Sequence, residues 1–201
     1  MKWIGCLLGQ FVSAGLAQLA PSDARPLTER ASVDWLYWED GRSAPPTWKS
    51  QGFDHSAWKR GAAPLGYGDD HFRTTLSYGE DSADKPITVL FRNVFRVAEI
   101  GQISPLRLEM MHDDGIIVYL NDKQLTRAYM PKGFVDMETP ALHRSNTVEA
   151  RYQTVAEAGD TLVQGRNVLA VEVHQSSSKS SDLGFDLALS YLHSSRRTRP
   201  F

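Results

Sequence analysis

The sequence predicts an all-β protein, a jelly-roll β-sandwich, and three observations lead to that class. Apolar and polar residues alternate with a period of two in many short segments, as half-buried strands do. A helical period of 3.6 is almost absent, with short exceptions at residues 47–51 and 54–58. Long irregular stretches at 61–86 and 131–149 lie between the strands. We therefore expect a sandwich with loops gathered at its ends and not a tight meander barrel.

The expected strands are short and are separated by turn residues. They lie at residues 33–38, 87–97, 106–111, 116–120, 124–129, 168–173 and 185–191. In the first, third and last, apolar residues recur at every second position, and the second is rich in β-branched and aromatic residues. The fourth follows Gly115, and Asn121-Asp122 supplies a tight turn before the fifth. The sixth follows a turn at residues 165–167.

The first 17 residues have the layout of a secretory signal peptide. Lys2 supplies a short positive region, and the apolar run at 3–12 is too short to span a bilayer. Small residues at Gly15 and Ala17 suit signal peptidase, so cleavage near Ala17 would make the protein secreted, periplasmic or exposed at the cell surface. The alternative is a frayed helix or a membrane anchor. The expected divisions are a signal peptide at 1–17, a linker at 18–31, the β-sandwich module at 32–193 and a basic tail at 194–201.

Composition argues against several functional classes. The chain has 22 basic and 24 acidic residues and a net charge of −2, which does not favour a nucleic-acid partner. No second apolar run approaches the roughly 20 residues of a membrane span. Cys6 is the only cysteine and would leave with the signal peptide, so the mature chain would have no disulfide. No motif of a serine hydrolase, zinc protease or phosphate-binding loop is present, so we expect a protein that is not an enzyme.

The segment 66–73 is the loop richest in candidate ligand groups. Tyr67, Asp69, Asp70, His71 and Arg73 gather there around two glycines. Sugar sites commonly combine an aromatic ring with a few placed polar groups, which makes this loop a candidate binding site. A Tyr, a His and an Arg together would also suit a polysaccharide lyase. The alternative is a packed surface loop.

Two aspartates before Gly115 are the next candidates. Because adjacent strand residues point to opposite faces, Asp113 and Asp114 would bind a ligand together only across a bulge. One hypothesis places a carboxylate in a calcium or sugar-hydroxyl site with Asp182 or His174. The alternative is that both aspartates cap turns. Calcium at Asp113, Asp114 and Asp182 is the one cofactor that the sequence suggests, although no dense D-x-D-x-D-G loop is present.

His174 and Gln175 directly follow an expected strand. They would either donate hydrogen bonds to a ligand at the rim of the sandwich or tie down the serine-rich loop at 176–182, since buried polar groups must be paired in either case. Trp38 and Trp48 border the loop at 41–46. As an exposed pair they would suit sugar stacking, and packing in the core or at its rim is the alternative.

Short motifs in a fixed order run from about Trp35 to Leu192. They include Phe53-Asp54-x-Ser56-x-Trp58, Ala63-Pro64-Leu65-Gly66-Tyr67-Gly68, Asp113-Asp114-Gly115-x-x-Val118-Tyr119-Leu120-Asn121, Arg127-x-x-Met130-Pro131 and Gly165-x-Asn167 through His174-Gln175. The series resembles the galactose-binding-domain-like jelly-roll modules of bacterial exported proteins, which are often appended to metallophosphatases. Its central part is similar to the sugar-binding domain of β-galactosidase-type hydrolases. Two departures are Asp122, where the family usually has Gly, and Tyr129, where it usually has Asn.

The resemblance implies a non-catalytic accessory role. We therefore predict an exported module that binds carbohydrate or a cell-surface glycan, or that docks a partner domain. Two alternatives stay open: a small exported polysaccharide lyase or hydrolase that uses Tyr67, His71 and Arg73, and a structural spacer truncated from a larger exported enzyme. The expected ligand-binding residues are Tyr67, Asp69, Asp70, His71, Arg73, Asp114, Arg127, His174, Gln175 and Asp182.

Overall fold

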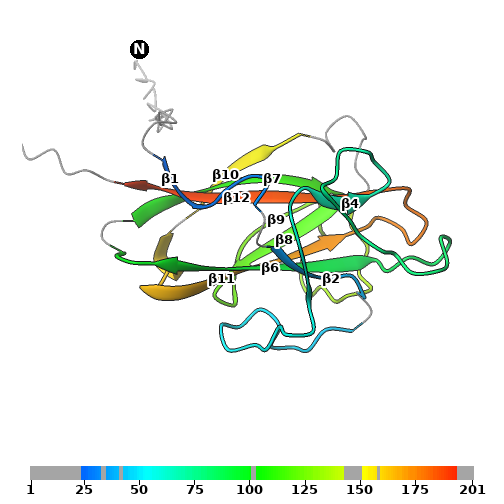
Figure 1. The fold of residues 1–201 in the computed structure, drawn as a ribbon, viewed down its shortest axis with the longest axis horizontal. Helices are drawn as coiled ribbons and strands as arrows, with labels where there is room; N and C mark the ends of the chain where they lie inside the picture. Colours follow the sequence, from blue (N-terminus) through cyan, green and yellow to red (C-terminus); the bar gives the residue numbers. More distant parts are fainter. Residues whose placement is uncertain are drawn as a thin grey trace, which may run out of the picture.

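The protein is a sandwich of two stacked β-sheets, as a computed structural model shows (Figure 1). The structure describes residues 24–32, 35–40, 43–100, 103–142, 151–157 and 159–193. The predicted all-β sandwich is confirmed. The expected signal peptide at 1–17, the first part of the expected linker and the basic tail at 194–201 lie outside the described residues.

The first sheet, the upper one in Figure 1, has the strand order β10-β7-β12-β4-β5, and β1 also pairs with β12. Its strands are β1 (Ala24–Thr28), β4 (Leu65–Tyr67), β5 (Thr74–Thr75), β7 (Ile103–Asp113), β10 (Gln153–Glu157) and β12 (Leu183–His193). All pairs are antiparallel except β4 with β5. Residues 24–28, which were expected in the linker, therefore belong to the sheet. A proline is tolerated there because β1 is a short edge strand.

The second sheet has the order β3-β2-β6-β11-β8-β9, and all its pairs are antiparallel. Its strands are β2 (Trp35–Trp38), β3 (Lys59–Gly61), β6 (Thr88–Val97), β8 (Gly115–Leu120), β9 (Lys123–Ala128) and β11 (Gly165–His174). A 3₁₀ helix at Gly159–Thr161 precedes β11. In the described part of the chain, no helix has the length and apolar character needed to cross a membrane.

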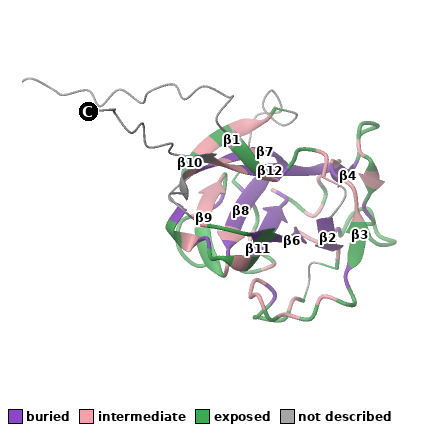
Figure 2. Ribbon diagram, turned by 60° about the vertical axis from the view of Figure 1, so that its left-hand side comes forward, coloured by how far each residue is buried: buried purple, intermediate pink, exposed green. Residues whose placement is uncertain are grey.

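The main core lies between the two sheets, where the inward residues of the long strands are buried (Figure 2). Phe185 on β12 is one of its fully buried aromatic residues. The Phe185 ring stacks on Phe91, with 4.1 Å between centroids, and meets the edge of Trp35 at 4.8 Å. Aromatic pairs of this kind add to the free energy gained by removing apolar area from water. The alternating residues read from the sequence are therefore the ones that hold the sheets together.

A third layer covers the outer face of the second sheet. The segment 43–58 crosses this face below β6 and β2 in Figure 1 and buries Trp48 and Trp58 against it. The two indole rings stack with 6.0 Å between centroids. Arg92 on β6 is fully buried and donates hydrogen bonds to the carbonyls of Trp48 and Ser50. Trp48 is thus a packing residue, and it does not form an exposed sugar-stacking pair with Trp38.

Candidate functional site

One end of the sandwich brings together most of the residues that the sequence singled out. β4, β7 and β11 all end there, and the loops at 68–73, 76–87 and 175–182 extend from this edge, at the right of Figure 1. We call this region the loop end. It contains Tyr67 at the end of β4, Asp113 and Asp114 at the β7–β8 turn, and Gln175 and Asp182 in the β11–β12 loop.

Tyr67 and Gln175 lie at the buried base of the loop end. Both are buried, and the Gln175 amide nitrogen donates to the Asp182 carbonyl at 2.6 Å and lies 3.4 Å from the Tyr67 hydroxyl. Burial, followed by the nearby charges of Asp113 and Asp182, raises the pKa of the Tyr67 phenol well above its usual range. The phenol therefore stays neutral at physiological pH, and its position suits a structural role better than contact with a ligand.

Asp114 and Asp182 also form hydrogen bonds within the protein. Asp114 is buried, and its Oδ2 accepts the Ser176 amide at 2.7 Å. The side chain of Asp182 accepts the Ser181 hydroxyl at 2.6 Å. Among the residues that the structure describes, no three His, Cys, Asp or Glu side chains form a group that could hold a metal ion. A calcium site at Asp113, Asp114 and Asp182 would need further oxygens, and it stays a prediction.

His174 lies at the same end but faces the outside of the second sheet. It is fully buried, with Nε2 3.0 Å from Glu172 Oε2 and Nδ1 2.9 Å from the Thr139 carbonyl. Arg127 on β9 is engaged in a similar way. Its guanidinium donates to the Gln124 side chain at 2.7 Å and to the Pro131 carbonyl at 2.8 Å. Both side chains hold neighbouring loops in place.

The loop after β4 is exposed, and its Tyr, His and Arg side chains make separate contacts. Phe72 packs over Gly66, where an added Cβ would lie 2.5 Å from its ring, while Tyr67 points into the core between the sheets. Adjacent strand residues point to opposite faces. His71 stacks on Phe72, with 4.3 Å between centroids, and Arg73 donates to the Ala31 carbonyl at 3.1 Å. Tyr67 is therefore buried while His71 and Arg73 are exposed, and a lyase role for these three residues stays a prediction.

A feature that the sequence did not reveal connects the loop at 76–87 with the loop at 175–182. Lys85 is buried, and its ammonium donates to the carbonyls of Ser82 at 3.0 Å and Ser180 at 2.7 Å. The same group lies 5.0 Å from the centroid of the Tyr78 ring, and that ring meets Tyr67 edge-on with centroids 5.0 Å apart. A lone lysine in a polar segment looks solvated in a sequence, so no local signal distinguishes Lys85.

Tyr78 also lines an open cavity of about 510 Å³ beside the loop end. Its other lining residues are Glu39, Asp40, Ser77, Gly79, Glu80, Asp81, Asp84 and Pro86. None of these is basic. Glu39 is part of the framework, because Oε2 accepts the Ser77 amide at 2.8 Å and Oε1 pairs with Lys59. Asp40 and Glu80 are exposed. The cavity therefore has one aromatic side and a rim rich in hydrogen-bond acceptors.

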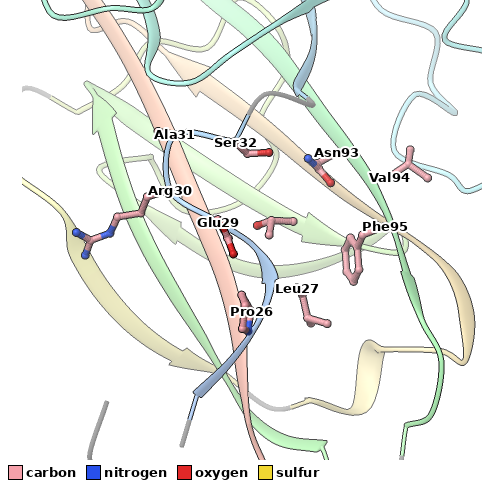
Figure 3. Close-up of a pocket in the computed structure, with 10 residues that line it drawn as sticks. Pro26, Leu27, Glu29, Arg30, Ala31, Ser32, Asn93, Val94 and Phe95 are labelled. Carbon is pink, nitrogen blue, oxygen red and sulfur yellow. The ribbon is translucent and has the colours of Figure 1, made fainter. Parts of the chain in front are cut away.

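A second cavity, of about 470 Å³, opens on the side of the sandwich. Figure 3 shows Pro26 to Ser32, from β1 and the segment after it, on one side and Asn93 to Phe95 of β6 on the other. Thr28 is tied to the sheet, since its hydroxyl accepts the Leu189 amide at 3.0 Å. None of the expected ligand-binding residues lines this cavity, and its aromatic residue, Phe95, belongs to the main core.

The fold and this site define a β-sandwich domain with a polar cavity at its loop end, and solved structures share that fold. No protein-family model matches the chain, and no curated protein matches it. A Bacteroides uniformis β-glucuronidase 2 covalently bound to cyclophellitol-6-carboxylate aziridine is 16% identical with a TM-score of 0.54. That match covers 83% of this chain and 18% of the enzyme.

Two further glycosidases give the same result. A β-glycosidase from Bacteroides vulgatus is 14% identical with a TM-score of 0.51, over 82% of this chain and 20% of that one. A β-glucuronidase from glycoside hydrolase family 2 is 14% identical with a TM-score of 0.51, over 86% and 18%. The chain thus spans about a fifth of the length of these enzymes. At these identities the likeness shows the fold alone, that of a β-sandwich domain found as one part of larger glycosidases. An association with metallophosphatases stays a prediction.

Proposed function

We propose that this chain is a non-catalytic domain that binds carbohydrate in the cavity between residues 39–40 and 77–86. The observation that carries the proposal is the lining of this cavity, which has one aromatic ring and a rim of hydroxyl and carboxylate groups. Its volume falls within the roughly 300–1,000 Å³ of small-molecule sites. A sugar ring presents an apolar face to an aromatic side chain and hydroxyl groups to acceptors, so it matches both parts of the lining.

The charge of the lining defines which sugars fit. Ionised carboxylates only accept hydrogen bonds, so Asp40, Glu80 and Asp81 would bind hydroxyl or ammonium donors. Among the lining residues that the structure describes none is basic, and Lys59, which contacts the lining residue Glu39, is paired with that carboxylate. Like charges at short range repel each other. The favoured ligands are therefore neutral sugars and amino sugars, and anionic glycans are disfavoured.

The fold comparisons support an accessory role. The similar structures are β-glucuronidases and a β-glycosidase, and this chain matches only about a fifth of each. We therefore propose that the domain attaches to, or acts beside, a carbohydrate-active enzyme. We also propose that it acts after export, on the basis of the layout of residues 1–17. Cell fractionation and N-terminal sequencing of the mature protein test the export.

A glycan array tests the binding role. The exported protein is applied to neutral, amino-sugar and anionic glycans, once with calcium and once with a chelator. We expect hits among the neutral and amino-sugar glycans, with affinities in the micromolar to millimolar range, or roughly −8 to −4 kcal/mol. Loss of these hits in chelator alone would add a calcium requirement. A blank array in both conditions would contradict the proposal and would favour a docking or spacer domain.

A pair of aromatic substitutions assigns any binding to the cavity. Tyr78→Ala removes the aromatic side of the cavity and should abolish or strongly weaken the hits. Phe134→Ala is the matched control, because Phe134 is 88% exposed and does not line the cavity. Equal loss in both variants, or loss only in Phe134→Ala, would place the sugar elsewhere.

A further inference from the structure

A third cavity, of about 390 Å³, opens on the outer face of the first sheet. Two small residues of β12, Ala188 and Ser190, line it and pair across the sheet with Glu109 and Arg107 of β7, which line it as well. The other lining residues come from β1 and the segment after it, namely Pro26, Thr28, Glu29 and Arg30. The cavity shares no lining residue with the proposed sugar site at the loop end.

Two guanidinium groups meet at one carboxylate in this cavity. Arg30 and Arg107 both donate to Glu109 Oε1, at 2.7 Å and 3.1 Å. One carboxylate carries a single negative charge, so it neutralises only one of the two cations. It also does not use all their donors, because each guanidinium has several N–H groups and Arg107 Nε has no hydrogen-bond partner among the described residues. The pair is therefore able to bind a second carboxylate beside Glu109.

Arg30 is held in position by the protein itself. Its guanidinium lies over the ring of Tyr152, 3.9 Å from the centroid, and the Tyr152 hydroxyl donates to Asp186. Asp186 is fully buried and also accepts the Ala31 amide at 2.9 Å, which fixes the backbone next to Arg30. Figure 3 shows the Arg30 side chain extending to the side opposite Phe95, out of the side cavity. A group that is already positioned loses less conformational entropy when it binds a ligand.

The neighbouring carboxylates decide how an anion would bind here. Glu29 lines the same cavity but is exposed, so water and salt screen its charge. Asp186 is hydrogen-bonded to Tyr152 and does not line the cavity. Together with Glu109 these acids balance the two arginines, so the site has no excess of positive charge. A ligand carboxylate would therefore be bound by directed, forked hydrogen bonds and not by a general attraction of anions.

The remaining polar groups of the lining match sugar hydroxyls. Ser190 and Thr28 have hydroxyl groups, and that of Thr28 accepts the Leu189 amide at 3.0 Å and so still has its own proton to donate. The Glu29 carboxylate accepts hydrogen bonds at the rim. The volume falls within the roughly 300–1,000 Å³ of small-molecule sites. A uronic acid combines one carboxylate with several hydroxyl groups, so it matches both parts of the lining.

We propose that this cavity is a second carbohydrate site, selective for uronic acids, in which Arg30 and Arg107 bind the sugar carboxylate beside Glu109. Its preference is opposite to that of the loop-end cavity, where none of the described lining residues is basic. The proposal does not depend on the loop-end site, because the two cavities are lined by different residues. Uronic acid glycans on the array should therefore keep binding to the Tyr78→Ala protein.

NMR titration of the ¹⁵N-labelled full chain tests the site. Galacturonate, galactose, acetate and sulfate are added separately, and the backbone amide and guanidinium Nε signals of Arg30 and Arg107 are followed. We expect saturable shifts with galacturonate and none with galactose. Acetate and sulfate should bind about tenfold more weakly, because they lack the hydrogen bonds of the sugar hydroxyls. Absence of saturable shifts with galacturonate would overturn the proposal, and equal binding of acetate or sulfate would overturn the selectivity for a sugar.

Two substitutions with opposite expected effects separate a binding site from a structural ion pair. Arg30→Gln removes one guanidinium and should weaken galacturonate binding about tenfold. Arg96→Gln is the matched control, because Arg96 is exposed on β6 and does not line the cavity. Glu109→Gln removes the carboxylate that competes for both arginines and should strengthen binding about threefold. Equal affinities of Arg30→Gln and Arg96→Gln, or weaker binding in Glu109→Gln, would contradict the proposal.

Discussion

The ammonium group of Lys85 lies over the ring of Tyr78, 5.0 Å from its centroid, while it donates to the carbonyls of Ser82 and Ser180. One buried cation thus joins the loop at 76–87 to the serine-rich loop at 176–182. It also sets the position of the ring that lines the cavity. The backbone of Lys85 adds a third connection, since its amide donates to the Ser178 carbonyl at 3.1 Å.

Replacing Lys85 should loosen both loops. Lys85→Met keeps the length and apolar stem of the side chain but removes both hydrogen bonds and the charge over Tyr78. Because the donor is charged, we expect a loss of roughly 1.5–3 kcal/mol in the free energy of unfolding, measured in urea. Lys179→Met is the matched control, because Lys179 is exposed in the same serine-rich loop. Equal stability of the two variants would contradict the role of Lys85.

A glycine directly after β4 permits close contact between the loop at 68–73 and the serine-rich loop at 176–182. Gly68 has a φ of +98°, and an added Cβ would lie 2.5 Å from Asp182 Cβ and 2.8 Å from the Ser181 carbonyl. Gly68→Ala should therefore cost about 1–3 kcal/mol through backbone strain and overlap. Gly52→Ala, where nothing lies within 4 Å, should leave stability nearly unchanged in the same denaturation experiment. Tolerance of Gly68→Ala would show that the loops are not packed as described.

Arg92 should stabilise the packing of the segment 43–58 on the outer face of the second sheet. Its guanidinium is buried and donates to two carbonyls of the segment 43–58, and burial, followed by the charge of Arg166, lowers its pKa to about 10. Arg92→Met leaves both carbonyls without their donor, so we expect a loss of roughly 1.5–3 kcal/mol and a change in tryptophan fluorescence as Trp48 moves. Arg166→Met is the control, because Arg166 is exposed and its removal relieves repulsion. Unchanged fluorescence in Arg92→Met would argue against this contact.

Buried tyrosines should make the protein lose stability at alkaline pH. Burial is the largest cause that raises the pKa of Tyr67, Tyr119 and Tyr152 above the ordinary value of 10.0. Below pH 10 these phenols are protonated in both the folded and the unfolded chain, and their contribution to the free energy of unfolding is fully present. Above pH 10 the unfolded chain ionises first, so stability falls as the pH rises. Tyrosinate absorbance should appear together with unfolding, and Tyr67→Phe should reduce the slope. Ionisation of Tyr67 in the folded protein would contradict this.

The sandwich architecture could be predicted from the sequence because each long strand has its own alternation of inward and outward residues. Residues 87–97 and 168–173 match β6 and β11 closely, since their inward residues fill one core. β1 was missed because Pro26 and its polar neighbours resemble a linker, and only the long-range pairing with β12 makes them a strand. A local pattern contains no information about such a partner.

The site was predicted less completely, for a similar reason. The sequence pointed to Tyr67, Gln175 and Asp182 separately, and the structure brings them together, with the Gln175 amide 3.4 Å from the Tyr67 hydroxyl and 2.6 Å from the Asp182 carbonyl. The sequence does not show which of them are covered by other loops. Tyr67 is buried because Tyr78 and Lys85 pack on it from a separate loop. The cavity combines residues 39–40 with 77–86, two segments that look unrelated along the chain.

The most direct test of the central claim is to map ligand binding by NMR. The strongest hit from the array is titrated into the ¹⁵N-labelled protein, and amide shifts are followed around both cavities. We predict saturable changes at Ser77, Tyr78 and Glu80, no changes at Glu29 to Ser32 of the side cavity, and no saturable binding in Tyr78→Ala. Saturable changes confined to the side cavity, or binding that Tyr78→Ala leaves intact, would contradict a carbohydrate site at the loop end.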